Sequence, residues 1–285
     1  MSRSNHCPNR RLALAAIAAL IAGCKTDSRK SVGTAGACPV RPTAALQPSN
    51  RLVVADATTL TSAELRTRLL DGLVGWAGAG DRFQVTHFGG TRAAWDGTAR
   101  LIEVEGKGQV GDAERWRHAP NEIARMLACA RATREDLRRA LSAALGQQDD
   151  SPAGQSPIFE SLMDLTQNWP GAAGSQRALV LISDGVQFSG NVAFLRSGRL
   201  TAPTPAELVR KLQRLDLVPQ LSGMCVLHLC LGVGIARGPA ATGGDLRTLK
   251  AAWMGYWAAT GARLLALGTP LPLDGLPAVA VSTHP

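Results

Sequence analysis

Aromatic residues are scarce in this chain, and their scarcity bears on what it can bind. Only 4% of the 285 residues are Phe, Trp or Tyr, and there is a single tyrosine. The formal net charge is +9, but lysines and arginines are scattered, and the densest group is Arg134, Arg138 and Arg139. Surfaces that bind nucleic acids combine basic side chains with aromatic rings on which bases stack. No such combination occurs here, so we expect no nucleic-acid partner and interpret the arginines as a solvated helix face.

Motifs that carry catalysis or bind zinc are also missing. There is no Gly-x-Ser-x-Gly elbow and no glycine-rich loop that would cradle a phosphate group. The six cysteines include no Cys-x-x-Cys pair, and His87, His118 and His228 have no metal-ligand spacing. His228 lies within an apolar segment, where a hydrogen-bonded core residue is the usual interpretation. These absences favour a protein that is not an enzyme.

One long apolar run stands at the N-terminus. Residues 12–23 (LALAAIAALIAG) follow several arginines and are too few to span a bilayer as a stable helix. The run ends in residues 21–24 (IAGC), which resemble the lipobox of bacterial lipoproteins. The resemblance implies that residues 1–23 are a signal peptide and that Cys24 becomes the first mature residue and carries acyl chains. Because Lys25 follows, the sorting rule of that family indicates the periplasmic face of the outer membrane. An ordinary signal peptide with a chance cysteine is the alternative.

Export would leave four cysteines in an oxidising compartment. These are Cys38, Cys129, Cys225 and Cys230, and they allow three complete pairings, among which the sequence does not choose. Cys225 and Cys230 are five residues apart in an apparent strand, so their side chains should point to opposite faces. We therefore expect no bond between those two.

Beyond the signal segment, composition divides the chain into a tether, one domain and a tail. Residues 24–49 contain Pro, Ser, Gly and charge without periodicity, which is typical of a flexible tether. Residues 50–267 alternate short apolar runs with amphipathic segments, as strands separated by helices do. Residues 268–285 are interrupted by proline and are expected to be irregular. The alternation predicts a doubly wound α/β fold, with a mostly parallel six-stranded sheet and helices on both faces.

Capping signals and stripes of apolar residues place the helices. Thr61 and Glu64 have the spacing of a capping box, and Thr204 with Glu207 forms another. Residues 120–146 read as two helical segments, with a fresh start at Thr133. Further helices are expected at 158–169 and along a stripe that contains Trp253 and Trp257, which we interpret as core. The expected strands are 52–55, 83–88, 101–104, 178–184, 225–234 and 263–267.

Two of the apolar runs end in an aspartate. RLVVADATTLT places Asp56 before a threonine-rich turn, and RALVLISDG places Asp184 before a glycine. In open α/β sheets, ligands bind outside the carboxyl ends of the strands, so two carboxylates delivered there are candidates for one shared site. The alternative is that each aspartate caps its own turn or the following helix.

The order of these features resembles a von Willebrand factor type A (vWA) domain. The first strand ends in Asp plus hydroxyls, a strand follows that begins Asp-Arg-Phe, and SPIFESLMDL precedes LVLISDG. Many domains of that family bind a divalent cation through Asp-x-Ser-x-Ser on one loop, a threonine on a second and an aspartate on a third. Mg²⁺ prefers about six oxygen ligands in an octahedron, which such loops can supply while leaving a position for the carboxylate of a partner.

Four positions of this sequence match that pattern with an oxygen, and a fifth does not. Asp56 matches the first ligand, Thr58 the first hydroxyl, Ser156 the hydroxyl of the second loop and Asp184 the last aspartate. Leu60 stands where the second serine should be and offers no oxygen. The resemblance thus implies a degenerate metal site, which binds Mg²⁺ weakly or no cofactor at all.

The function expected from the sequence is protein binding. A vWA-like lipoprotein of the envelope would use its loops to bind a protein partner, which the sequence does not identify, and the lipid bilayer through Cys24. The alternative is an Asp-dependent hydrolase or phosphatase, because DATTLT resembles the Asp-x-Asp-x-Thr loop of haloacid dehalogenase-like enzymes. In this chain Thr58 replaces the second aspartate, which acts there as the acid and base.

Overall fold

A six-stranded sheet forms the centre of the structure. The computed structural model describes residues 49–59, 62–77, 81–89, 118–146, 156–167, 169, 176–234 and 241–268, and the backbone of residues 102–105. The strand order is β3-β2-β1-β4-β7-β8; β3 is antiparallel to β2 and the other neighbours are parallel. The strands are β1 Ser49–Asp56, β2 Arg82–Phe88, β3 Ile102–Glu105, β4 Gln176–Ile182, β7 Met224–Leu229 and β8 Arg263–Leu267.

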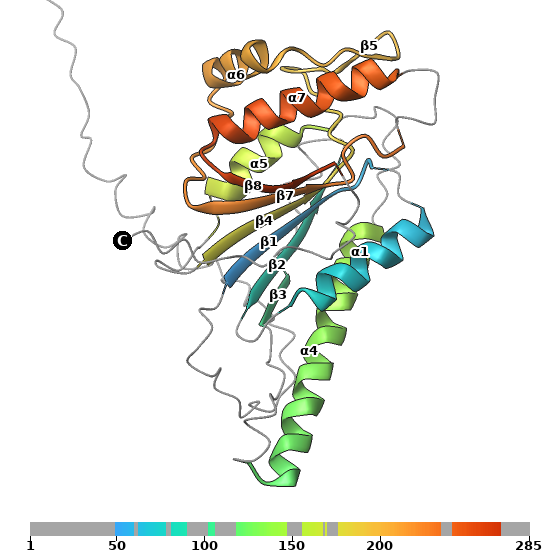
Figure 1. Cartoon of the computed structure of the whole chain (residues 1–285), viewed down its shortest axis with the longest axis vertical. Helices are drawn as coiled ribbons and strands as arrows, with labels where there is room; N and C mark the ends of the chain where they lie inside the picture. Colours follow the sequence, from blue (N-terminus) through green and yellow to red (C-terminus); the bar gives the residue numbers. More distant parts are fainter. Residues whose placement is uncertain are drawn as a thin grey trace, which may run out of the picture. The chain divides into compact units, whose positions relative to one another are not determined.

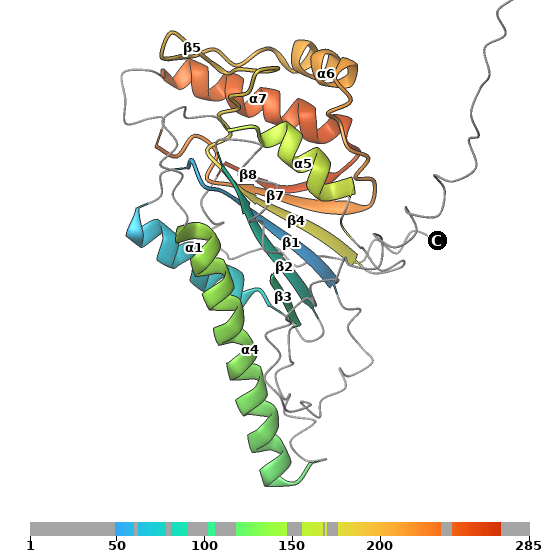
Figure 2. The ribbon, with the colours of Figure 1, turned by 180° about the vertical axis from the view of Figure 1, so that it is seen from behind.

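Helices cover both faces of this sheet. Figures 1 and 2 show α1 and α4 on one side, and α5, α6 and α7 on the other. The helices are α1 Ala63–Gly75, α4 Pro120–Gly146, α5 Ile158–Gln167, α6 Pro205–Arg214 and α7 Gly243–Ala259. The expected α/β class, with a doubly wound and mostly parallel sheet, is therefore confirmed.

Successive side chains of the central strand β1 point alternately into two hydrophobic cores, one on each face of the sheet. In β1, Val53 and Ala55 pack with the α1 and α4 side, whereas Leu52 and Val54 pack with the α5, α6 and α7 side. All eight residues of β1 are buried. A strand with helices on both faces must be apolar on both, and this is why its sequence reads as a continuous hydrophobic run.

Aromatic side chains of α7 fill the core on one face. Trp253, Tyr256 and Trp257 are fully buried, and Phe159 of α5 lies 4.9 Å from Trp253 between ring centroids. His228 of β7 packs edge-on against Trp253 at 4.6 Å, and its Nδ1 accepts a hydrogen bond from the Trp257 indole. The interpretation of these tryptophans and of His228 as core residues is confirmed.

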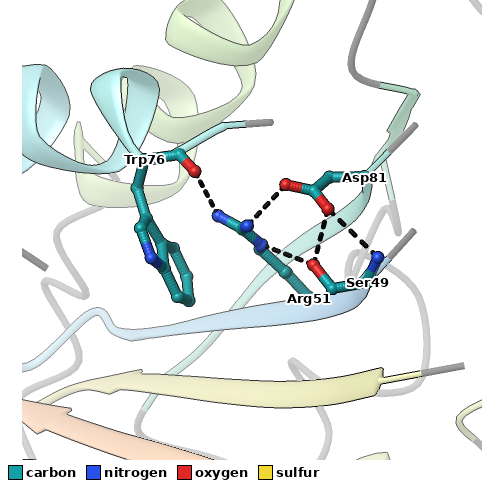
Figure 3. A network of polar contacts seen from close by, with 4 residues as sticks. All are labelled: Ser49, Arg51, Trp76 and Asp81. Atoms are coloured by element: carbon teal, nitrogen blue, oxygen red, sulfur yellow. Dashed lines mark hydrogen bonds and ion pairs between the residues drawn. The ribbon is translucent and has the colours of Figure 1, made fainter. Parts of the chain in front are cut away.

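An arginine is buried at the amino end of β1. Arg51 lies 3.8 Å above the Trp76 ring and forms an ion pair with Asp81, whose carboxylate also accepts from the Ser49 hydroxyl and amide. Figure 3 shows that the guanidinium also donates to the Trp76 carbonyl and to Ser49. Burial lowers the pKa of Arg51 to about 10, although the negative charge of Asp81 opposes this shift. The network ties the end of α1 and the start of β2 to β1.

Two expected helix boundaries are wrong. The N-cap of α1 is Ser62, whose hydroxyl accepts from the Leu65 amide, and not Thr61, which lies outside the described residues. Residues 120–146 form one continuous helix, α4, and not two segments. The Thr133 hydroxyl donates to the Cys129 carbonyl one turn earlier, so it bonds within the helix and does not cap a new one.

The loop after β4 contains a hairpin that the sequence analysis did not predict. It consists of β5 (Leu195–Arg196) and β6 (Arg199–Leu200), and Gly198 between them has a φ of 75°. A positive φ favours glycine, and two-residue strands are too short for alternation to show. The strand expected at 225–234 is also shorter, because β7 ends at Leu229.

The cysteines form none of the three complete pairings that the sequence allows. Cys225 and Cys230 are both free and buried, so the expectation that they do not bond to each other is confirmed. Cys129 is disulfide-bonded. The expected signal peptide, Cys24, Cys38, most of the tether and the tail beyond Gly268 lie outside the described residues. In the part of the chain that is described, no helix is long and apolar enough to cross a membrane.

Candidate functional site at the carboxyl ends of β1 and β4

Two neighbouring parallel strands deliver the candidate residues to one edge of the sheet. Ala55 of β1 pairs with Ile182 of β4, so the residues that follow, Asp56 and Ser183, come side by side. Asp184 is next along the chain. Parallel strands end at the same edge, and the loops that follow them meet there without disturbing the core.

Asp56 is the centre of a dense network of hydrogen bonds. Its Oδ1 accepts from the Thr58 amide at 2.9 Å and the Thr58 hydroxyl at 2.6 Å. Its Oδ2 accepts from the hydroxyls of Ser156 at 2.9 Å and Ser183 at 2.8 Å. Burial raises the pKa of Asp56, while these donors oppose the rise because they favour the ionised form. The carboxylate therefore joins three segments of the chain.

Asp184 is half-buried and has fewer partners. Its Oδ1 accepts from the Val186 amide at 2.8 Å, and its own amide donates to the Thr59 hydroxyl at 3.0 Å. Burial and then the negative charge of Asp56 raise the pKa of Asp184 to about 7. Asp184 therefore gains or loses a proton near neutral pH.

Helix α5 holds the segment that follows Asp184. Ser156 and Phe188 exchange two backbone hydrogen bonds, each 2.9 Å long. The amide oxygen of the fully buried Gln187 accepts from the Phe159 amide, and its nitrogen donates to Glu160. Glu160 also accepts from the Ser189 hydroxyl at 2.7 Å. The second and third loops of the site are therefore fixed to each other by main-chain and side-chain bonds.

A tryptophan of the aromatic core holds the loop after β4 by a hydrogen bond to its backbone. The Trp253 indole donates to the Gly185 carbonyl at 2.9 Å. Gly185 has a φ of 76°, and a Cβ at this position would lie 2.7 Å from the Trp253 indole nitrogen. Glycine is required here both by the backbone angle and by the closeness of the ring.

Two other titratable groups near the site, the Cys230 thiol and the His228 imidazole, are uncharged near neutral pH. Burial, followed by the negative charge of Asp184, raises the pKa of the Cys230 thiol to about 12, so it is not a thiolate near neutral pH. Burial lowers the pKa of His228 to about 3, so its imidazole is neutral. Neither residue has the protonation state of an activated nucleophile or a proton donor.

The structure brings together the four residues that the sequence predicted. Thr58, Ser156 and Asp184 surround Asp56 as the geometry above describes, whereas Leu60 lies outside the described residues. Ser183 was missed, although it donates directly to Asp56. Ser183 stands one residue before Asp184 in the sequence. In the paired strands it is Ser183, and not Asp184, that comes level with Asp56.

The donor set is compatible with a hard divalent cation. Two carboxylates and three hydroxyls are oxygen ligands of the kind that Mg²⁺ prefers. Burial and then the negative charge of Asp56 raise the pKa of Asp184, and a cation beside both carboxylates would favour the ionised form. Asp56, Asp184 and the hydroxyls of Thr58 and Ser156 are the residues that would hold such an ion. Among the side chains that the structure describes, no cluster of three or more His, Cys, Asp or Glu could hold a metal ion, so an ion at this site would depend on the hydroxyl oxygens as well.

Comparison with known proteins identifies similar structures but no family. No family model matches the chain, and no curated protein matches it significantly. An aerotolerance-related membrane protein from Bacteroides fragilis is similar with 12% identity and a TM-score of 0.33, over 78% of this chain and 92% of that one. BatB from Bacteroides thetaiotaomicron gives 13% and 0.35, over 78% and 91%. The pilus adhesin SpaC from Lactobacillus rhamnosus GG gives 14% and 0.39, over 79% and 28%. Identities and TM-scores this low support no inference about the site.

Proposed function

We propose that this chain is a lipoprotein of the bacterial envelope whose vWA-like domain binds another protein. The binding site is the set of loops that we call the site loops: residues 56–59, Ser156 and residues 183–191. The observation that carries the proposal is the convergence of Asp56 and Asp184 at one sheet edge. Loops on a rigid sheet are suited to recognition because they present polar groups while the core stays intact.

The chemistry of the site favours binding over catalysis. Four donors already occupy the carboxylate of Asp56, so it is poorly available as a nucleophile. In the hydrolase alternative, a second aspartate would transfer the proton, but Thr58 stands at that position and donates to Asp56. One observation does favour the hydrolase: an Asp184 pKa of about 7 is suitable for a general acid. Assaying p-nitrophenyl phosphate with wild type and Asp56→Asn tests this alternative, and we expect no turnover by either.

A divalent metal ion would assist binding without being essential to the site. Hydrogen bonds hold the site loops together without an ion, and the hydroxyl oxygens of Thr58 and Ser156 remain able to coordinate one. Since Leu60 supplies no oxygen where the resemblance has a serine, affinity for Mg²⁺ should be weak. The open coordination position would take a carboxylate of the partner protein.

Partner capture in the native envelope tests the binding site. We would crosslink whole envelopes and recover this chain from wild type, from Asp184→Ala with Ser156→Ala, and from Arg82→Ala. Arg82 is exposed at the opposite, amino end of β2, so its loss serves as the control. We expect the partner bands to fall at least tenfold in the site variant and to stay in the control. Bands retained by a site variant with a native circular dichroism spectrum would show that binding lies elsewhere.

Lipid anchoring at Cys24 is tested separately. Each buried CH₂ contributes about 0.8 kcal/mol, so two or three acyl chains hold a protein firmly on a bilayer. Growth with an alkynyl fatty acid should label wild type and leave Cys24→Ala unlabelled. Equal labelling of both would exclude the lipidation site without affecting the proposal for the site loops.

A further inference from the structure

The outer layer of the α5–α7 side carries a concentration of positive charge. Seven exposed cations lie on α6, α7 and the β5–β6 hairpin, and we call this set the basic face. Figures 1 and 2 show these elements together on the side of the sheet away from α1 and α4. The basic face consists of Arg196, Arg199, Arg210, Lys211, Arg214, Arg247 and Lys250.

The acidic residues of these elements offset only part of this charge, because Glu207 interacts electrostatically with Arg210 and Asp245 with Arg199. Glu207 and Asp245 are engaged in the capping boxes of α6 and α7, where their carboxylates accept from the hydroxyls and amides of the N-cap threonines. Within the described residues, no ion pair joins any cation of the basic face to an acidic side chain. On the opposite side, Arg138 of α4 is paired with Asp71 of α1, and Arg139 with Asp136.

Exposed apolar side chains lie on the same two helices. Met254 and Leu215 are the large hydrophobic residues that the described structure exposes, at 52% and 38%. Met254 is one helical turn beyond Lys250, and Leu215 directly follows Arg214. A surface with cations around a few protruding apolar side chains can pair with acidic headgroups and insert those side chains between them.

We propose that the basic face docks on an anionic phospholipid bilayer. Acidic headgroups above an apolar interior match both the cations and the protruding side chains of Met254 and Leu215. A nucleic acid would find no exposed aromatic ring among the described residues of this layer on which to stack. The site loops stand at an edge of the sheet and not on the outer surface of α6 and α7, so both surfaces can be used at once. The docking does not require the acyl chains on Cys24.

Vesicle partitioning with charge-reversed variants tests this surface. The full chain carries Cys24→Ser in every sample, so that no acyl chain holds it and its apolar N-terminus contributes equally. Partition coefficients are measured on phosphatidylcholine vesicles and on vesicles of phosphatidylcholine and phosphatidylglycerol in equal amounts. Their ratio measures the preference for anionic lipid. The variant Arg210→Glu, Lys211→Glu, Arg214→Glu reverses the three positive charges that α6 contributes to the basic face.

A matched control makes the same change of charge on the other side. Arg68→Glu, Arg125→Glu, Arg131→Glu reverses three exposed arginines of α1 and α4 that form no ion pair in the described structure. We expect the basic-face variant to lower the ratio at least tenfold, and the control to lower it no more than about threefold through net charge. Equal loss in both variants, or no preference of the parent chain for phosphatidylglycerol, would overturn the proposal.

A neutral substitution distinguishes a bilayer from a soluble polyanion. Met254→Gln keeps every charge but removes the apolar side chain, and we expect it to reduce partitioning into the anionic vesicles severalfold. Circular dichroism spectra should be the same for all variants, because each substituted side chain is exposed. Unchanged partitioning of Met254→Gln would contradict docking with insertion into the bilayer.

Discussion

Replacing Asp184 by asparagine should stabilise the folded protein at alkaline pH. The asparagine Oδ1 can still accept from the Val186 amide, so the substitution removes the charge and keeps the bond. The pKa of Asp184 is raised from 3.8 to about 7 in the fold, by burial and then by the charge of Asp56. Between these two values the folded state binds more protons than the unfolded state, so wild type loses stability as pH rises.

The size of the effect follows from the pKa shift. From pH 5 to the pKa near 7, two pH units at about 1.36 kcal/mol each give nearly 3 kcal/mol. Asp184 is only half-buried, and solvent screens its interaction with Asp56, so we expect about 1–3 kcal/mol. The advantage of Asp184→Asn in the free energy of unfolding should grow by this amount between pH 5 and pH 8 and then stay constant.

Urea denaturation at a series of pH values measures this difference. The control is Glu135→Gln, which removes the same charge from an exposed position on α4. Its advantage over wild type should stay nearly constant with pH. If the curves of Asp184→Asn and wild type run parallel from pH 5 to pH 9, neither burial nor Asp56 raises the pKa of Asp184 in the folded protein.

Three further predictions concern the same elements. Mg²⁺ should raise the melting temperature slightly at pH 8 and much less at pH 6, where a proton occupies Asp184, and calorimetry should show no shift in Asp184→Asn. In urea melts, Gly185→Ala should lower the free energy of unfolding by roughly 2–5 kcal/mol, because the added Cβ would stand on a left-handed backbone and overlap with Trp253. Gly198 has a similar φ but open space around it, so Gly198→Ala should lower that free energy by about 1–2 kcal/mol. Val54→Asp buries an unpaired charge in the central strand and should prevent folding, so soluble protein with a cooperative melt would contradict the core assignment.

The sequence predicted the fold well because its strands are buried on both faces. Continuous apolar runs such as those around Val54 and Val180 have one common explanation in a parallel sheet, and the helices between them follow from it. The errors in the helix boundaries occurred where the same residue type can either cap a helix or bond within one. Thr133 has the residue type of a helix cap, but its hydroxyl bonds to the preceding turn, and α4 continues through it while packed against α1 and the sheet.

The candidate site was predictable in composition but not in its bonding. Strand ends indicated that Asp56 and Asp184 would meet, because parallel neighbours finish at the same edge. The role of Ser183 depends on the register between β1 and β4, which no short pattern in the sequence encodes. The difference between the two carboxylates also depends on geometry, since Asp56 collects four donors, whereas the side chain of Asp184 accepts from one backbone amide.

This difference determines what competes with a metal ion at the site. A hydroxyl has one proton and two lone pairs, so Thr58 and Ser156 can donate to Asp56 and coordinate a cation at the same time. The hydrogen bonds made by these two hydroxyls are therefore compatible with metal binding, whereas a direct bond from Asp56 to the ion would have to displace one of the four donors on its carboxylate. The proton on Asp184 does oppose it, because burial and then the charge of Asp56 raise the pKa of this carboxyl group, and a metal ligand must be deprotonated. Metal affinity at this site should thus be controlled mainly by the ionisation of one carboxyl group, and both the asparagine variant and the pH dependence of the Mg²⁺ effect measure that group directly.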